Sequence, residues 1–336
     1  MNIKLVALCV IATSFFAGPD LTTGPGHDLT KVLGPSECIE CHKHSGGIWE
    51  SSPHHKSITE VHRSPEGQAI AKKLNIRRIG KNSLCLDCHA TSKQIGEEVT
   101  TVAKGPSCES CHGAAADWMS RHGEFSGKEE GQESKEEIAA RWKEAEGSGM
   151  LRPSMVLEIA RNCVSCHVVP HEDLVNVGGH SAGSDFELVS WSQGNIRHNN
   201  FYSKGKHNKQ ASIEKRRLFH IVGIMAEMEL VLEAISTAKK MGTYAKKNAQ
   251  RFSLLRKKLA AVNKAIDHPQ IKATMASISK LKMSLSNQPA IALAAKKVSE
   301  SLNAFAILSD GSKLAGVDPL LSKTADYKGG EPGSNK

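Results

Sequence analysis

The stretch that decides the fold is Gly105-Pro-Ser-Cys-Glu-Ser-Cys-His-Gly-Ala-Ala-Ala-Asp-Trp-Met-Ser-Arg-His122. It contains the pentapeptide Cys108-Glu-Ser-Cys111-His112, and a second histidine, His122, follows ten residues after the first. Two thiols at this spacing can add across the two vinyl groups of one haem, and the adjoining histidine can bind its iron. Both cysteines and the histidine must face one porphyrin edge, which a single helical turn allows. The stretch therefore predicts a haem c attachment site.

The same pattern occurs three more times, as Cys38-Ile-Glu-Cys41-His42, Cys85-Leu-Asp-Cys88-His89 and Cys163-Val-Ser-Cys166-His167. One copy alone would also suit a zinc knuckle or a thioredoxin-like redox pair. Four copies, each with a histidine directly after the second cysteine, favour haem, since zinc sites have no need of that histidine every time. Eight of the nine cysteines lie in these motifs, and Cys9 lies in an N-terminal apolar run. We therefore predict four covalently attached haem c groups, each with its motif histidine as proximal iron ligand.

The composition of the chain also favours a fold built around cofactors. Of 336 residues, 39% are hydrophobic and only 4% are aromatic, so the polypeptide alone would form a thin core. Four large, flat haems would supply the missing apolar surface, and we expect the motif-bearing part not to fold without them.

The basic charge of the chain favours an acidic protein partner over a nucleic acid. The formal net charge is +9. Four haems would add about eight propionate carboxylates, which are ionised at neutral pH and bring the holoprotein much nearer to neutrality. We therefore expect a lysine-rich face that docks an acidic redox partner, and no nucleic-acid binding.

The N-terminus predicts export. Residues 1–17 form a secretory signal with one lysine before an apolar run that is too short for a membrane span. Ala17 suits the last position before cleavage, whereas Phe15 does not suit its position, so a retained N-terminal anchor is the alternative. Export agrees with the haem motifs, because bacteria attach haem c outside the cytoplasm. No later stretch is long and apolar enough to span a bilayer, so we expect a periplasmic or otherwise exported protein without a membrane span in the mature chain.

The sequence predicts an all-α protein. Its composition divides the chain into two folded parts and two flanking segments. We expect an extended segment over 18–35, a tetrahaem domain over 36–207 with little regular sheet, an antiparallel helical bundle over 208–312 and a flexible tail over 313–336. Apolar residues recur at helical spacing over 218–235, 252–266, 271–285 and 291–308, and Pro269 and Pro289 suit helix starts. Met225 and Met228 lie on an apolar stripe, which favours core packing over iron ligation. Between the third and fourth motifs, Ser134 to Glu137 resembles a capping box.

The sixth coordination position of each iron decides between electron transfer and chemistry, because a second histidine saturates the iron and a vacancy admits small molecules. The haem region is rich in histidines outside the motifs. The candidates there are His44, His54, His55, His62, His122, His171, His180 and His198, whereas we interpret His220 and His268 of the bundle as structural.

Three segments resemble the tetrahaem cytochrome c-554 family, which shares its haem arrangement with parts of hydroxylamine oxidoreductase and the pentahaem nitrite reductases. They are Trp49-x-x-x-x-His54, Gly105 to Gly113 with His122, and Arg161-Asn-Cys-Val-Ser-Cys-His167, within about residues 36–200.

The resemblance implies distal ligands for three haems and a vacancy at the fourth. It places His54 on the third haem (His112), His122 on the fourth (His167) and His198 on the first (His42), and it leaves the second haem (His89) five-coordinate. This sequence departs from the family in having His180, whose neighbouring glycines would let the backbone approach a porphyrin closely. His180 could fill the second haem's vacancy or exchange roles with His198, and His27 is a further candidate. The bundle lies outside the resemblance.

These features leave three hypotheses of function open. The first is a periplasmic carrier that moves electrons between an oxidoreductase and a downstream acceptor, with hydroxylamine oxidation as the source that the resemblance suggests. The second is nitric oxide or hydroxylamine chemistry at an open second haem, with Asp87, Lys93 and Glu97 nearby in sequence; the chain has no Cys-x-x-Cys-Lys motif, which weighs against nitrite chemistry. The third is a haem subunit of a larger assembly, or a homo-oligomer, docked through the bundle.

Overall fold

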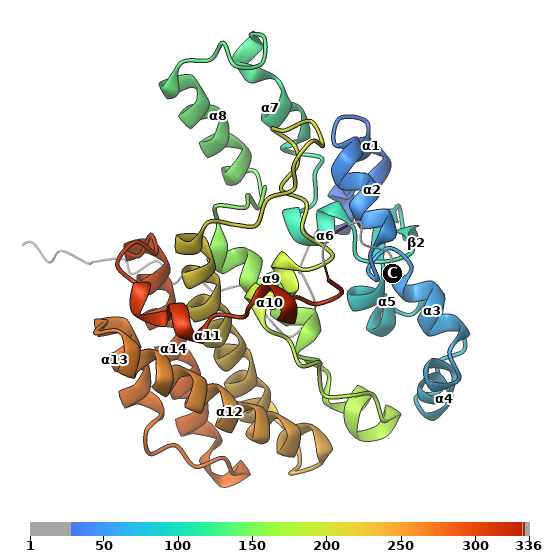
Figure 1. Ribbon diagram of the computed structural model, residues 1–336. Helices are drawn as coiled ribbons and strands as arrows, with labels where there is room; N and C mark the ends of the chain where they lie inside the picture. The colour runs from blue at the N-terminus through green and yellow to red at the C-terminus, as the bar shows by residue number, and fades with distance from the viewer. Residues whose placement is uncertain (1–27, 331, 333–336) are drawn as a thin grey trace, which may run out of the picture.

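The computed structural model describes residues 28–330 and 332. Figure 1 shows short helices and long connections in the first two thirds of the chain, and longer helices packed side by side in the last third. The short helices are α1 (Pro35–Ile39), α2 (Lys43–Ser51), α3 (Ser57–Arg63), α4 (Pro65–Lys73), α5 (Ser83–His89), α6 (Cys108–His112), α7 (Met119–Gly123), α8 (Lys135–Gly147), α9 (Val156–His167) and α10 (Leu188–Gln193). A single turn of π-helix lies between α9 and α10, over Leu174–Gly178. The predicted all-α class with little sheet is confirmed.

The haem motifs lie at helix ends. Helices α5, α6 and α9 each end on a motif histidine, and the first motif begins in α1 and ends at His42, just before α2. The Cys-x-x-Cys-His spacing therefore spans about one helical turn at each site, as a single porphyrin edge requires.

One hairpin joins the second and third motifs. Strands β1 (Thr91–Ile95) and β2 (Glu98–Ala103) pair antiparallel. The β-branched run from Val99 to Val102 favours a strand, and Gly96, with φ of +60°, supplies the turn.

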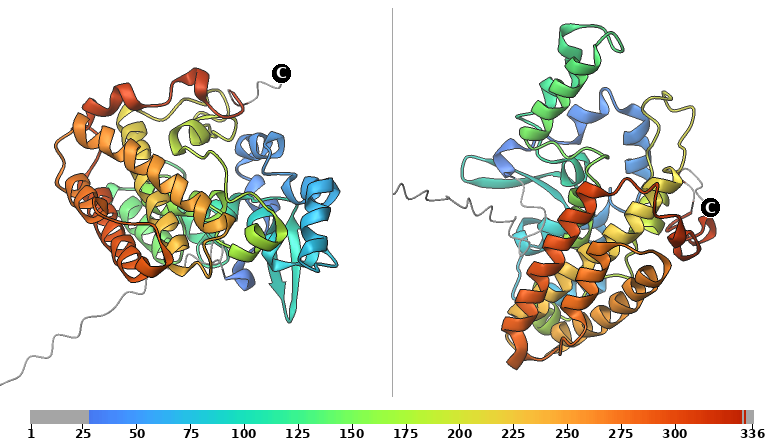
Figure 2. Two further views of the ribbon diagram at one scale, coloured as in Figure 1. Left: turned by 90° about the horizontal axis from the view of Figure 1, so that it is seen from below. Right: turned by 90° about the vertical axis from the view of Figure 1, so that its left-hand side faces the viewer.

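The segment between the third and fourth motifs forms an arm. Helices α7 and α8 project away from the bundle in Figures 1 and 2. The capping box at the start of α8 is confirmed, because the Ser134 hydroxyl accepts from the Glu137 N–H and the Glu137 carboxylate accepts from the Ser134 N–H.

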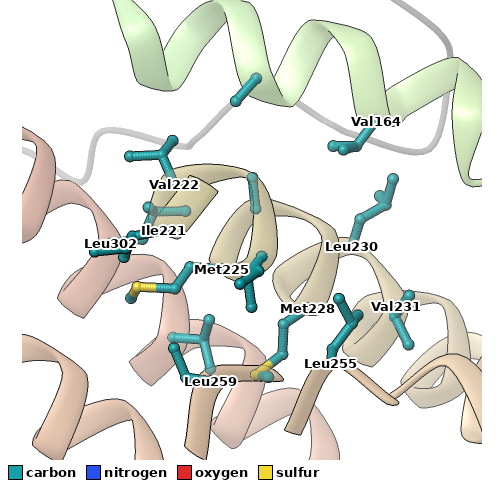
Figure 3. Close-up of a cluster of buried hydrophobic side chains, with 14 of the residues drawn as sticks. Val164, Ile221, Val222, Met225, Met228, Leu230, Val231, Leu255, Leu259 and Leu302 are labelled. Atoms are coloured by element: carbon teal, nitrogen blue, oxygen red, sulfur yellow. The ribbon is translucent and has the colours of Figure 1, made fainter. Parts of the chain in front are cut away.

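Four amphipathic helices form the bundle, as predicted. They are α11 (Ile213–Thr237), α12 (Thr243–Ala265), α13 (Pro269–Ile278) and α14 (Gln288–Leu308). Pro269 and Pro289 occupy the first turn of α13 and α14. Met225 and Met228 are fully buried among leucine, isoleucine and valine side chains (Figure 3), so their predicted core role is confirmed.

The haem region and the bundle share one hydrophobic core. Leu157 and Val164 of α9 pack into the same cluster as the buried residues of α11, α12 and α14. Arg161 of α9 makes a two-fold hydrogen-bonded ion pair with Glu229 of α11, with both N–O distances 3.0 Å. The compositional boundary near residue 208 is therefore not a boundary in packing.

The predicted flexible tail was wrong for residues 315–330. A 3-10 helix over Ala315–Leu320 buries Val317 fully, and Arg217 donates two hydrogen bonds to Asp318 at 2.7 and 2.8 Å. Further along, the Lys328 N–H donates to the Ser190 carbonyl. The tail folds back because these polar and apolar partners lie on α10 and α11.

The predicted signal sequence, Cys9 and His27 lie outside the described residues. Among residues 28–330 and 332, no helix is long and apolar enough to cross a membrane.

Candidate haem-binding sites

Each motif histidine faces one other histidine across a gap of constant width. The ring centroids of His42 and His122 lie 6.2 Å apart, and those of His89 and His180 lie 6.3 Å apart. His112 and His198 are separated by 6.1 Å, and His167 and His54 by 6.2 Å. We number these pairs sites 1 to 4 by the order of their motifs, so that site 1 is His42–His122, site 2 is His89–His180, site 3 is His112–His198 and site 4 is His167–His54.

The width of the gap matches two imidazoles bound to one iron. Two metal–nitrogen bonds of about 2 Å, together with about 1 Å from each nitrogen to its ring centre, separate the two centroids by about 6 Å. Four independent pairs agree with this value to within 0.2 Å of one another. The residues present therefore fit one haem iron between the two rings of each pair.

Hydrogen bonds orient most of these rings toward the gap. The Nδ1 atom of His112 lies 2.8 Å from the Leu151 carbonyl, that of His180 lies 2.7 Å from the Ser181 carbonyl, and that of His198 lies 2.8 Å from the Ile196 carbonyl. His122 makes the same contact with the Met119 carbonyl. A carbonyl can only accept, so each Nδ1 carries the proton and leaves Nε2 free as a metal ligand.

Two motif histidines use serine hydroxyls in the same position. Nδ1 of His89 lies 2.7 Å from the Ser57 hydroxyl, and Nδ1 of His167 lies 3.1 Å from the Ser184 hydroxyl. Ser57 lies in α3, and Ser184 lies between the π-helical turn and α10. Both hydroxyls therefore fix ring orientation through tertiary packing.

Burial keeps the motif histidines neutral. It lowers the pKa of His89, His112 and His167 to about 4, with the neighbouring histidine of each pair as the second cause. Burial also lowers the pKa of His54. The neutral imidazole is the form that binds a metal, so the environment already selects the ligating state.

The motif cysteines place neighbouring sites in contact. Cys38 of site 1 lies close to Cys108 of site 3, and Cys88 of site 2 lies close to Cys166 of site 4. Cys111 of site 3 also lies close to Cys166. These thiols stand where thioether sulfurs would be in the haem-bound protein, and their contacts set the order site 1, site 3, site 4, site 2.

Contacts to the backbone hold sites 3 and 4 side by side. The Asn162 side chain of α9 donates to the carbonyls of Ser110 and Cys111 in α6, which holds the third motif against the fourth. Gly105 lies directly against the His54 carbonyl, where any Cβ would clash, so this glycine lets the loop that carries His54 pass the third motif.

Residues 37–113 match the family model described as cytochrome c554 and c-prime. The matched segment contains the first three haem motifs and His54. This match supports the resemblance of that segment to the cytochrome c554 family. A c-type cytochrome binds haem c and its iron covalently. No curated protein and no solved structure matches this chain.

The histidine pairing in the structure differs from the one that the resemblance implied. His54 faces His167 and not His112, His122 faces His42 and not His167, and His198 faces His112 and not His42. The cause is tertiary packing. Because α6 packs against α9, each of these three histidines faces a motif histidine other than the one that the resemblance implied. His180 faces His89, the histidine whose haem the family leaves open.

The remaining histidines of the region stay outside these pairs. His44 packs against Gly205, His55 against the Trp49 ring, and His171 interacts with Asp87. Among the described residues, no group of three or more histidine, cysteine or acidic side chains could hold a metal ion. A haem iron needs only two protein ligands, since the porphyrin supplies the other four.

One tryptophan was not singled out from the sequence. Trp118 is 5% exposed, packs edge-on against His122 with centroids 5.2 Å apart, and its indole Nε1 has no hydrogen-bond partner among the described residues. A buried indole N–H normally has an acceptor. A cofactor with carboxylate groups beside His122 would supply one, which is a further fit between site 1 and a haem. No sequence pattern distinguishes this tryptophan from the other three.

Proposed function

We propose that this cytochrome is an exported tetrahaem electron carrier. Each site would hold one haem c, attached through two motif cysteines and ligated by two histidines. The observation that carries the proposal is that every motif histidine has a second histidine at about the spacing of two ligands on one iron. Haem c supplies one-electron chemistry at its iron, without bond changes in a substrate.

The ligand sets favour transfer over catalysis. His180 occupies the position opposite His89, so no motif histidine within the described residues lacks a partner ring. Two histidines keep the coordination the same in both oxidation states, which limits reorganisation.

The order of sites gives the electron a path. Contacts between motif cysteines run from site 1 through sites 3 and 4 to site 2, so electrons would enter at one end and leave at the other. Charged side chains near each site would tune its potential. The partners would be a redox enzyme and a downstream acceptor, and a hydroxylamine-oxidising enzyme is the donor that the family resemblance suggests.

The bundle supports the haem region as a scaffold. Most of its apolar side chains are buried against one another and against α9, and Arg161–Glu229 joins the two parts. The exposed large apolar side chains of the bundle are Leu254, Leu293, Ile307 and Leu308, so assembly through the bundle stays an alternative.

Two measurements test the proposal. Intact-mass analysis of the holoprotein should show the added mass of four haems, and fewer haems would contradict the tetrahaem assignment. Separately, His54→Ala, His122→Ala, His180→Ala and His198→Ala should each convert one haem from low spin to high spin. His62→Ala, which changes an exposed histidine outside the pairs, is the matched control and should leave the spectrum unchanged.

A further inference from the structure

We propose that the loop over residues 199–209, together with Lys43, forms the face through which site 1 exchanges electrons with an acidic redox protein. This inference rests on the proposed carrier function and adds the place and the charge of the partner.

An aromatic pair links site 1 to the surface. The Phe201 ring lies 4.7 Å from the ring of His42, and the Tyr202 ring lies 5.3 Å from that of Phe201. Tyr202 is 89% exposed, which is unusual for a side chain of its size. The pair therefore runs from a ligand of site 1 to solvent in two steps.

Site 1 is also the site with the most accessible attachment edge. Cys41 alone among the eight motif cysteines is exposed, whereas the other seven are half-buried. Because Cys41 would carry the thioether bond, its exposure places one edge of the site 1 cofactor near the surface. Site 1 lies at one end of the order of sites, where electrons would pass to or from a partner.

The charged side chains of the loop all have one sign. Lys204, Lys206 and Lys209 are exposed, as is Lys43 next to His42. The sequence has no aspartate or glutamate from residue 188 to residue 213. A cationic surface with an exposed aromatic at its centre fits a partner that presents carboxylates around its own redox centre.

The loop is held in one conformation, so the face is preorganised. The Ser45 hydroxyl donates to the Asn200 side chain at 2.8 Å, and the Gly205 N–H donates to the Asn200 carbonyl at 3.0 Å. Gly205 has φ of +79° and lies against His44, so the turn excludes larger residues. A rigid loop loses little entropy on docking.

In the reducing direction, the partner would lose one electron and a ferric haem iron held between His42 and His122 would gain it. No bond forms or breaks and no proton moves. The loop's lysines and Tyr202 act on the encounter and leave the iron's ligands unchanged.

The test compares two charge-reversal variants of the holoprotein. One carries Lys204→Glu, Lys206→Glu and Lys209→Glu, and the control carries Lys280→Glu, Lys282→Glu and Lys297→Glu, three exposed bundle lysines. Both change the net charge equally. Stopped-flow kinetics would follow reduction by an acidic flavodoxin in its one-electron-reduced form, at low and high ionic strength, with midpoint potentials measured for each variant.

We expect the loop variant to be reduced at least about tenfold more slowly at low ionic strength, with the difference vanishing at high salt. The control should keep the wild-type rate and both should keep the wild-type potentials. Equal rates for the two variants would overturn the proposed face. A wild-type holoprotein that does not pass electrons even from a small chemical reductant would instead overturn the carrier function itself.

Discussion

The two parts of this molecule are stabilised in different ways. The bundle buries long apolar stripes, with Ile221, Leu259 and Phe305 fully enclosed. The haem region from α1 to α8 has only small clusters, such as the one of Ala115, Trp118 and Ala145. The difference shows that a chain can place redox cofactors in a region that lacks its own core, provided that a neighbouring bundle supplies the frame.

Removing the haems should change the difference between the two regions more than any substitution. The full chain expressed without haem attachment should lose amide protection over α1–α8, while α11, α12 and α14 stay protected, because only the bundle has a continuous core. Hydrogen exchange with mass spectrometry compares the two forms directly. Equal protection of both regions in the apoprotein would show that the haem region folds independently of its cofactors.

Removing the ion pair between the haem region and the bundle should have the second largest effect. Glu229→Ala leaves the half-buried Arg161 without its carboxylate partner, and we expect a loss of about 3–5 kcal/mol in urea unfolding. The control is Glu60→Ala, which removes an exposed i,i+4 partner of Lys56 and should leave stability unchanged. A loss no larger than that of the control would mean that the pair does not join the two parts.

A methionine variant separates core packing from ligation. Met225→Leu nearly conserves volume, so it should cost less than about 1.5 kcal/mol and leave the visible spectrum of the holoprotein unchanged. A shifted haem spectrum would contradict the core role of Met225.

Replacing Tyr244, which joins α12 to the segment after α9, should have the smallest effect on stability. This effect should depend on pH. The Tyr244 hydroxyl donates to the Pro170 carbonyl at 3.0 Å, and burial raises its pKa. Its folded pKa is above the unfolded value of about 10, so this contribution is complete below pH 10 and is lost as the pH rises further. Tyr244→Phe should cost about 1 kcal/mol at pH 7 and weaken the alkaline loss of stability.

The exposed Tyr202 provides the control for loss of a hydroxyl. Tyr202→Phe should leave the stability at pH 7 unchanged, because the side chain is 89% exposed. Urea unfolding between pH 7 and pH 11 measures both variants. Identical alkaline behaviour of Tyr244→Phe and the wild type would remove Tyr244 as the cause.

Local patterns predicted the elements well. The motif spacing placed the cysteines at helix ends, and the apolar periodicity located all four bundle helices, because both signals depend on one helical turn. The capping residues Ser134 and Glu137 likewise act within four residues.

Long-range relations could not be predicted in the same way. Which distal histidine faces which motif depends on α6 packing against α9, a contact between segments far apart in the chain. The fold-back of the tail depends on Arg217 and Asp318, separated by 101 residues. A polar, glycine-containing tail looks disordered until its partners are known.

The most direct test of the account is low-temperature EPR of the oxidised holoprotein, followed by addition of nitric oxide to the reduced form. If every motif histidine shares its iron with the histidine that faces it, all ferric signals should be low spin and no nitrosyl adduct should form. A high-spin signal from one haem that converts to a nitrosyl species would contradict the account, because it would show an open iron where the structure places two rings.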